Sequence, residues 1–189
     1  MPANSKGGSF PCWRCGLVTV AVLLGGGCQP KPKAPALIDE PIYQSDEGFR
    51  FLVPDGWIMA ARANVPPGPV NKERRLVQYR RSSGDFNAIL EVSLMDLPED
   101  TDLTAYLSRP SFSARHWEPS GQAESMEAGG VHGTRFRFSA SIEGRKLAKE
   151  VTAFRRGGRV YFFTLLCPPK DAAAQEQSRR LIGGLVWTK

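Results

Sequence analysis

The chain has 189 residues, 41% of them hydrophobic, which is enough for one domain of ordinary size with a real core. Its formal net charge of +6 includes Lys6 and Arg14, which belong to a leader without acidic residues. From residue 28 onward, 23 basic residues stand against 19 acidic ones, a net charge of +4. This mild excess gives no reason to expect a nucleic-acid partner.

Residues 1–27 have the pattern of an export signal. A positive stretch is followed by nine apolar residues and by three glycines ahead of Cys28. The apolar run is too short to span a bilayer. Cys12 and Cys15 lie in this leader, where chance explains a C-x-x-C motif better than redox or zinc chemistry does. Only Cys167 remains in the folded part, so no internal disulfide is expected.

The residues before Cys28 resemble the lipobox of bacterial lipoproteins. The resemblance implies that signal peptidase cuts before Cys28, whose sulfur then carries diacylglycerol and whose new amino group is acylated. Because one acyl chain binds membranes only reversibly, stable anchoring needs the several chains of such a cysteine. Gly25 stands where a lipobox usually has leucine, with Leu24 one residue further back. Ordinary secretory cleavage after the glycines is the alternative.

Residues 28–41 are predicted to form a tether between this anchor and a domain at residues 42–189. The segment is rich in proline and contains two lysines, a composition typical of a semi-rigid, extended spacer. Gln29 follows the cysteine, which by resemblance to Gram-negative lipoproteins implies the outer membrane where the cell has one. We therefore expect a cell-envelope protein that is lipid-anchored on the extracytoplasmic side.

The domain begins with alternating apolar residues. Residues 48–57 predict a strand that ends at a Pro-Asp-Gly turn, and its inward face holds Phe49, Phe51 and Val53. Residues 76–80 and 87–95 predict the next two strands, so we expect a meander. Further on, acidic residues precede a helical periodicity that points Leu103, Tyr106 and Leu107 inward, and Pro110 should end or kink that helix.

Two short turns predict the strand register of residues 131–167. A two-residue loop at Glu143-Gly144 places Phe136 opposite Val151, Ala140 opposite Leu147 and Arg137 opposite Glu150. A second such loop at Gly157-Gly158 pairs Ala153 with Phe162 on one face and Phe154 with Tyr161 on the other. Residues 160–167 are then a central strand that is buried on both faces. The helical segments around 101–117 and 171–185 are the expected covers, which gives an α+β fold, an α/β/α sandwich around a largely antiparallel sheet.

Several stretches of the domain resemble the PsbP-like fold, over about residues 45–187. They are GFRFLVPDGW, the GTRFRF strand, the RVYFFTLLCPP strand, the amphipathic helix that follows and the terminal LVW. This fold also includes a eukaryotic Ran-binding protein and many bacterial lipoproteins. The resemblance implies a non-enzymatic binding or assembly module. From the residues themselves we expect no cofactor and no metal.

The sequence contains none of the common hydrolase, phosphate-binding or dinucleotide-binding motifs. His116 with Glu118 has the residue types of an acid–base pair, yet a partly buried packing role is favoured for the histidine. His132 has no partner at metal-ligand spacing. Cys167 ends a buried strand, so an inert core thiol is expected rather than a nucleophile. Four acidic residues precede or begin the predicted helix, and a calcium-binding loop is one interpretation of them. They lack the spacing of an EF-hand, so a solvated role at the helix start is favoured for Asp96, Glu99, Asp100 and Asp102.

Three arginines frame the Gly157-Gly158 turn, namely Arg155, Arg156 and Arg159, and we call this feature the arginine turn. Solvated strand ends that discourage edge pairing explain it most simply. The sharper hypothesis is an anion-contacting surface that meets an acidic protein or an anionic envelope component. We thus expect a monomeric, membrane-anchored module that binds rather than catalyses. The alternative is a small-ligand carrier or an enzyme with a pocket between sheet and helix.

Overall fold

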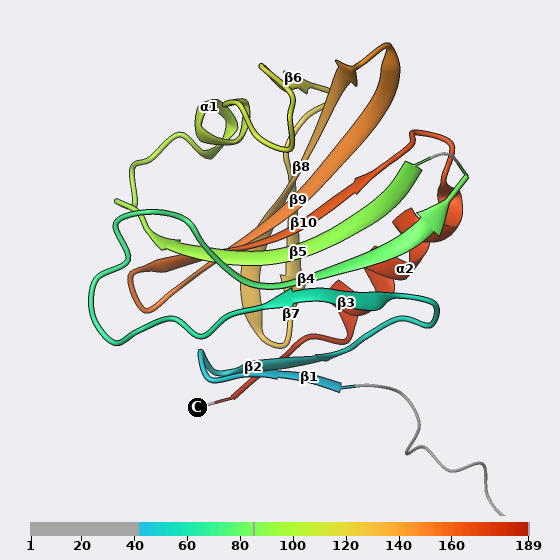
Figure 1. Ribbon diagram of the computed structural model, residues 1–189. Coiled ribbons are helices and arrows are strands. Elements are labelled where there is room, and N and C mark those ends of the chain that lie inside the picture. Colours follow the sequence, from blue (N-terminus) through green and yellow to red (C-terminus); the bar gives the residue numbers. More distant parts are fainter. Residues whose placement is uncertain (1–41, 85, 189) are drawn as a thin grey trace, which may run out of the picture. The chain divides into compact units, whose positions relative to one another are not determined.

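The computed structural model describes residues 42–84 and 86–188 of the chain. The predicted leader, Cys28 and the tether lie outside the described residues. The described part folds into a large antiparallel sheet, a small sheet and two helices (Figure 1). Neither of these helices combines the length and the apolar character needed to cross a membrane.

The large sheet has β10 near its centre, with β5 on one side and β9 on the other. Its strands in spatial order are β3 (Ile58–Arg62), β4 (Arg74–Ser83), β5 (Phe86–Asp96), β10 (Arg159–Cys167), β9 (Arg145–Arg156), β8 (Val131–Ile142) and β6 (Glu118–Pro119). A further strand, β7 (Glu124–Ala128), pairs with the first part of β8. The prediction of a central strand at residues 160–167 is confirmed.

The small sheet was not foreseen. It consists of β1 (Ile42–Ser45), β2 (Phe49–Leu52) and β11 (Val186–Trp187), with β2 in the middle. The strand predicted within residues 48–57 is β2, which ends before the Pro-Asp-Gly turn as predicted, and β3 follows that turn in the large sheet. The expectation that residues 48–57 open a meander with the next two strands was wrong, because β2 pairs with β1 and β11 instead.

Both hairpin registers agree with the prediction. The β8–β9 hairpin pairs Phe136 with Val151, and the β9–β10 hairpin pairs Phe154 with Tyr161. Positive φ angles occur at both loop residues of each turn, 51° and 77° at Glu143-Gly144 and 61° and 77° at Gly157-Gly158. This is the backbone of a type I′ turn, whose twist matches the twist of the flanking strands.

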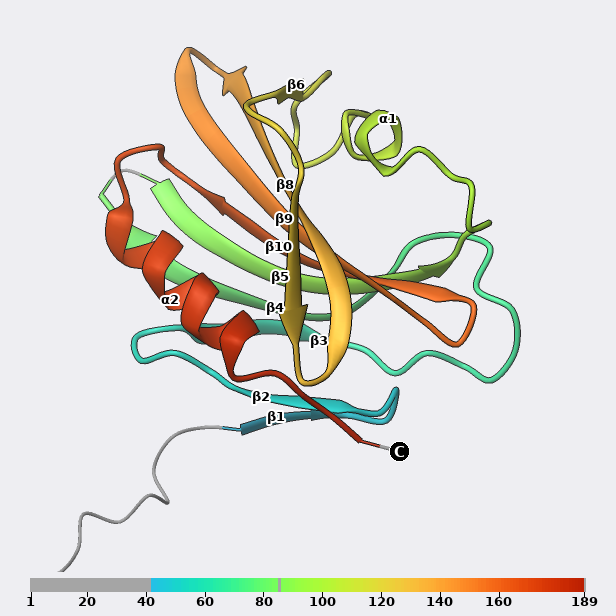
Figure 2. The ribbon, with the colours of Figure 1, turned by 180° about the vertical axis from the view of Figure 1, so that it is seen from behind.

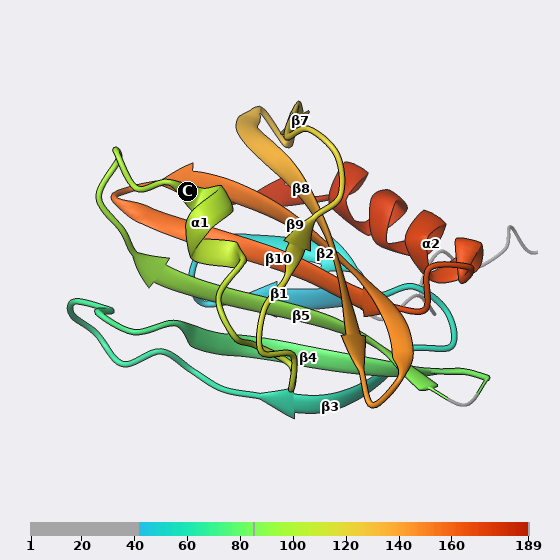
Figure 3. The same ribbon diagram turned by 90° about the horizontal axis from the view of Figure 1, so that it is seen from above.

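The large sheet is covered differently on its two faces (Figures 1, 2 and 3). The helix α2 (Ala172–Gly183) and the small sheet lie on one face, and the helix α1 (Leu103–Leu107) lies on the other. Successive residues of β10 alternate between the two cores, with Phe163 in the first and Phe162 in the second. The α+β class with a largely antiparallel sheet and helical cover on both faces is confirmed.

The helix α1 is a single short segment. The Asp102 carboxylate caps it by accepting hydrogen bonds from the backbone N–H groups of Thr104 (2.9 Å) and Ala105 (3.1 Å). The helix ends before Pro110, as the sequence predicts. The chain then turns through Phe112 and Ser113, both with positive φ. Irregular backbone therefore provides most of the cover on this face.

Candidate functional site

The arginine turn does not form one cluster of side chains. Arg155 points to the α1 side, where its guanidinium donates to the carbonyl oxygens of Pro98 (2.9 Å), Leu97 (3.4 Å) and Thr101 (3.4 Å). It thereby ties the loop before α1 to the end of β9. This contact gives the guanidinium a structural role inside the domain.

Arg156 and Arg159 point to the other face. Arg156 donates to the carbonyl oxygens of Gly48 (3.1 Å) and Thr188 (2.7 Å), and its guanidinium lies 5.3 Å from the centre of the Trp187 ring. It therefore joins the β1–β2 turn to the end of the chain. The same cation–π contact covers one face of the indole.

Arg159 has two carboxylate partners from distant parts of the sequence. Its guanidinium lies 2.5 Å from Glu47 and 3.2 Å from Asp96, and it also donates to the Gly68 carbonyl at 3.0 Å. No acidic residue lies next to the turn in the sequence, because Glu47 and Asp96 reach it only through the fold. All three guanidinium groups thus have partners within the protein, and their contact with an external anion stays a prediction.

The two histidines lie on the surface and apart from each other in the fold. His116 is 57% exposed, with Nε2 3.5 Å from the Glu118 carboxylate, so the expected packing role was wrong. The buried aromatic residue is its neighbour Trp117. His132, in β8, is 86% exposed and lies 3.8 Å from Glu127. Both contacts are solvent-exposed, a setting in which an ion pair contributes little energy.

Cys167 is a buried thiol, as expected. It lies at the end of β10 with 1% of its surface exposed. Burial raises its pKa to about 12, and the charge of Asp171 acts in the same direction. Because the thiolate is the nucleophilic form, this side chain is inert at neutral pH.

The four acids considered for calcium do not gather around a common point. Asp102 caps α1, which confirms the expected helix-start role for this residue. Asp96 instead accepts from the Val70 backbone N–H at 2.6 Å and pairs with Arg159. Within residues 42–84 and 86–188, no three or more histidine, cysteine or acidic side chains are placed to hold a metal ion.

Lys149 is a buried cation that the sequence analysis missed. It is 3% exposed, and its Nζ donates to the Leu107 carbonyl at 2.5 Å. The ammonium also lies 4.6 Å from the centre of the Trp117 ring and 4.9 Å from that of Phe138. Burial lowers its pKa to about 8. The lysine therefore connects β9 to the end of α1 through a carbonyl and two aromatic faces.

The predicted strand register could have identified Lys149 as a buried residue. Lys149 lies between Leu147 and Val151 on the inward face of β9, and the hairpin places it opposite Phe138. A lysine at such a position must extend through the core or find partners there. The sequence alone did not indicate Trp117, which comes from the irregular segment after α1.

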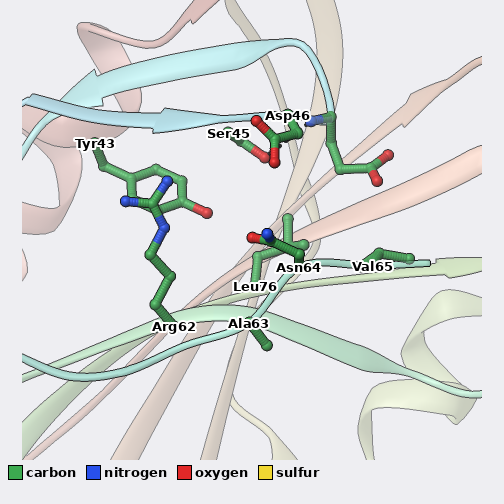
Figure 4. A pocket seen from close by; sticks show the side chains of 9 residues that line it. Tyr43, Ser45, Asp46, Arg62, Ala63, Asn64, Val65 and Leu76 are labelled. Atoms are coloured by element: carbon green, nitrogen blue, oxygen red, sulfur yellow. Dashed lines mark hydrogen bonds between the residues drawn. The ribbon is translucent and has the colours of Figure 1, made fainter. Parts of the chain in front are cut away.

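Figure 4 shows a small polar hollow between the β1–β2 turn and the chain that follows β3. Its lining residues are Tyr43, Ser45, Asp46, Glu47, Arg62, Ala63, Asn64, Val65 and Leu76. Asp46 and Asn64 approach it from opposite sides. Its volume of about 10 Å³ is about the space that one water molecule needs. Neither His116 nor Cys167 lines it, so it gives no support to the predicted carrier or enzyme pocket between sheet and helix.

No protein-family model matches the chain, and no match was found among curated protein sequences. Solved structures do match. Cyanobacterial PsbP (CyanoP) from Synechocystis sp. PCC 6803 superimposes with a TM-score of 0.56 and 16% identity, over 82% of this chain and 96% of CyanoP. LpqN, involved in cell envelope biogenesis of Mycobacterium tuberculosis, gives a TM-score of 0.49 and 15% identity, over 80% of this chain and 94% of LpqN.

The similarity to CyanoP shows that the domain has a PsbP-like fold, as the sequence resemblance implies. At 16% identity it shows the fold alone. The lipid anchor at Cys28 and the link to a Ran-binding protein remain predictions from the sequence.

Proposed function

We propose that this protein is a lipoprotein of the cell envelope whose PsbP-like domain binds a partner rather than catalysing a reaction. The lipid anchor is inferred from the position of Cys28, which lies between an export-signal pattern and a segment rich in proline and lysine. The lipid holds the domain on the extracytoplasmic side. In a cell with two membranes, Gln29 favours the outer one.

The position of the first strand supports a separate domain after the tether. Strand β1 begins at Ile42, immediately after the proline-rich segment. The domain has apolar cores on both faces of its large sheet, so these faces are occupied by its own side chains. Binding would therefore use the outer surfaces of the domain.

The arrangement of the candidate chemical groups supports binding over catalysis. His116 is exposed in the irregular segment before β6, His132 is exposed in β8, and Cys167 is buried with a raised pKa. Nucleophilic catalysis needs a nucleophile within hydrogen-bond reach of its activating base, and the hydrogen bonds of the described residues do not join Cys167 to either histidine. The anionic partner predicted for the arginine turn would have to compete with the carbonyl and carboxylate groups that these arginines already contact.

Metabolic labelling tests the anchor. Cells that express the full chain are grown with a clickable palmitate analogue, and the labelling of wild type, Cys28→Ala and Cys167→Ala is compared. We expect label in wild type and in Cys167→Ala, the matched control that keeps the predicted attachment site, and none in Cys28→Ala. Equal labelling of Cys28→Ala, or a mature protein whose mass lacks the acyl groups, would overturn the anchor.

A further inference from the structure

The outer face of the small sheet carries exposed apolar side chains. Residues alternate along its three strands, and the inward ones pack on the aromatic core. Among the described residues, five large apolar side chains stand out as exposed, and three of them belong to this face: Ile42 (62%), Leu52 (44%) and Val186 (42%). Ile42 and Leu52 are direct cross-strand partners. They form a continuous apolar pair at one end of the sheet.

The polar side chains of this face carry no negative charge that would repel an anionic surface. Arg50 lies between Gln44 and Val186 as the cross-strand partner of both. The other outward residues of the three strands are apolar, so none of the outward side chains that these described strands contribute is acidic. Asp46 and Glu47 are in the β1–β2 turn, at the opposite end of the strands from Ile42 and Leu52. The face thus combines an arginine with aliphatic side chains.

The chain enters the domain on this same face. Ile42 is both the first residue of β1 and one of the three exposed aliphatic residues. The 13 residues 29–41 connect it to Cys28. Even fully extended, they reach at most about 45 Å. A lipid on Cys28 would therefore keep Ile42 within about 45 Å of the bilayer, so that a weak surface contact gains from a raised effective concentration.

We propose that the outer face of the β1–β2–β11 sheet is the surface through which the domain rests on the bilayer. The proposal rests on the lipid anchor proposed above. The aliphatic side chains contact the boundary between headgroups and acyl chains, and Arg50 contacts lipid phosphate. Three side chains are too few for the roughly 800 Å² that each partner buries in a standard protein interface. A bilayer requires no such area, because the tether already supplies the proximity.

Nuclear magnetic resonance of the tethered protein tests the contact directly. The chain from Cys28 to Lys189, with methyl-labelled isoleucine, leucine and valine, is coupled through the Cys28 thiol to a maleimide lipid. The coupled protein is then placed in nanodiscs of phosphatidylcholine and phosphatidylglycerol. Cys167 is buried and does not compete for the maleimide. Chemical coupling makes the test independent of whether cells acylate Cys28, so failure of the anchor and failure of this contact are distinguishable.

Doxyl-labelled lipid should erase most of the methyl signal of Ile42, Leu52 and Val186. Ile58 is the internal control, because it is 75% exposed but lies on the opposite face of the large sheet. Its neighbour Met59 pairs with Tyr79, which belongs to the core under the small sheet, and adjacent residues of a strand alternate between faces. The Ile58 methyl signals should therefore keep their intensity.

A pair of variants distinguishes direct contact of this face with the lipid from mere proximity to the bilayer. The double variant Leu52→Asp with Val186→Asp should restore the Ile42 signal, whereas Ile58→Asp should leave the pattern of wild type. Unchanged methyl spectra of the core would show that both variants fold. Equal signal loss at Ile58 and Ile42 in wild type would overturn the proposal. So would signal changes at this face that require a second protein copy and no lipid.

Discussion

The two faces of the large sheet are closed by different kinds of structure. On one face, α2 and the small sheet form a regular layer over a core rich in aromatic rings. On the other, a five-residue helix and irregular chain cover a smaller core. In the first cover, backbone pairing joins the three strands of the small sheet. The second cover is held to the large sheet by hydrogen bonds from side chains such as Lys149 and Arg155. The same central strand is thus covered by regular secondary structure on one face and by a mostly irregular segment, held by side-chain hydrogen bonds, on the other.

The largest effect should come from the regular face. Phe49 is fully buried, and its ring lies 5.6 to 6.3 Å from five other aromatic rings, those of Tyr43, Phe51, Tyr161, Phe163 and Trp187. Both surrounding layers are sheets, so a cavity there has little room to collapse. Phe49→Ala should lower the free energy of unfolding by about 5 kcal/mol, measured by urea denaturation. A loss under about 1 kcal/mol would contradict the described packing of β2.

A smaller loss should follow on the irregular face. Phe162 is 1% exposed, and its ring stacks on Tyr106 of α1 at 5.6 Å. Because α1 is short and can move inward, the cavity left by Phe162→Ala should partly close. We expect a loss of about 3 to 4 kcal/mol in the same denaturation experiment. A loss equal to that of Phe49→Ala would remove the difference between the two faces.

The smallest effect concerns pH. The pKa of Lys149 is lowered from 10.5 to about 8 by burial, so between these values the unfolded chain binds more protons than the folded one. The contribution of Lys149 to stability should therefore rise with pH in this range, by up to about 1.4 kcal/mol per pH unit, and should be lowest below pH 8. Lys149→Met keeps the volume but removes this slope.

Urea denaturation at intervals between pH 8 and pH 9.5 measures the effect of Lys149. The difference between wild type and Lys149→Met isolates the lysine, because other titrating groups are common to both. An identical slope in the two proteins would mean that the ammonium is not desolvated by the cover. The irregular face would then be more open to water than its contacts indicate.

The resemblance to a PsbP-like fold followed from local patterns, and the candidate site did not. An aromatic strand, a Pro-Asp-Gly turn and two glycine turns are short sequence features, and each was visible without the structure. The acids that face Arg159 are far away in the chain, so no spacing rule could have placed them there. The exposed face of the small sheet was not predicted either, because an alternating pattern of apolar residues does not show which of two sheets a strand joins.

The sequence by itself determined the two hairpin registers and the buried character of β10. A two-residue loop with positive φ admits few registers, and the period of two then assigns every side chain to a face. Only the tertiary structure decided that β2 leaves the large sheet for a small one completed by the end of the chain, at Val186 and Trp187. It also decided that Lys149 meets Trp117. These pairings join residues far apart in sequence, and their energy depends on the assembled layers rather than on local backbone preference.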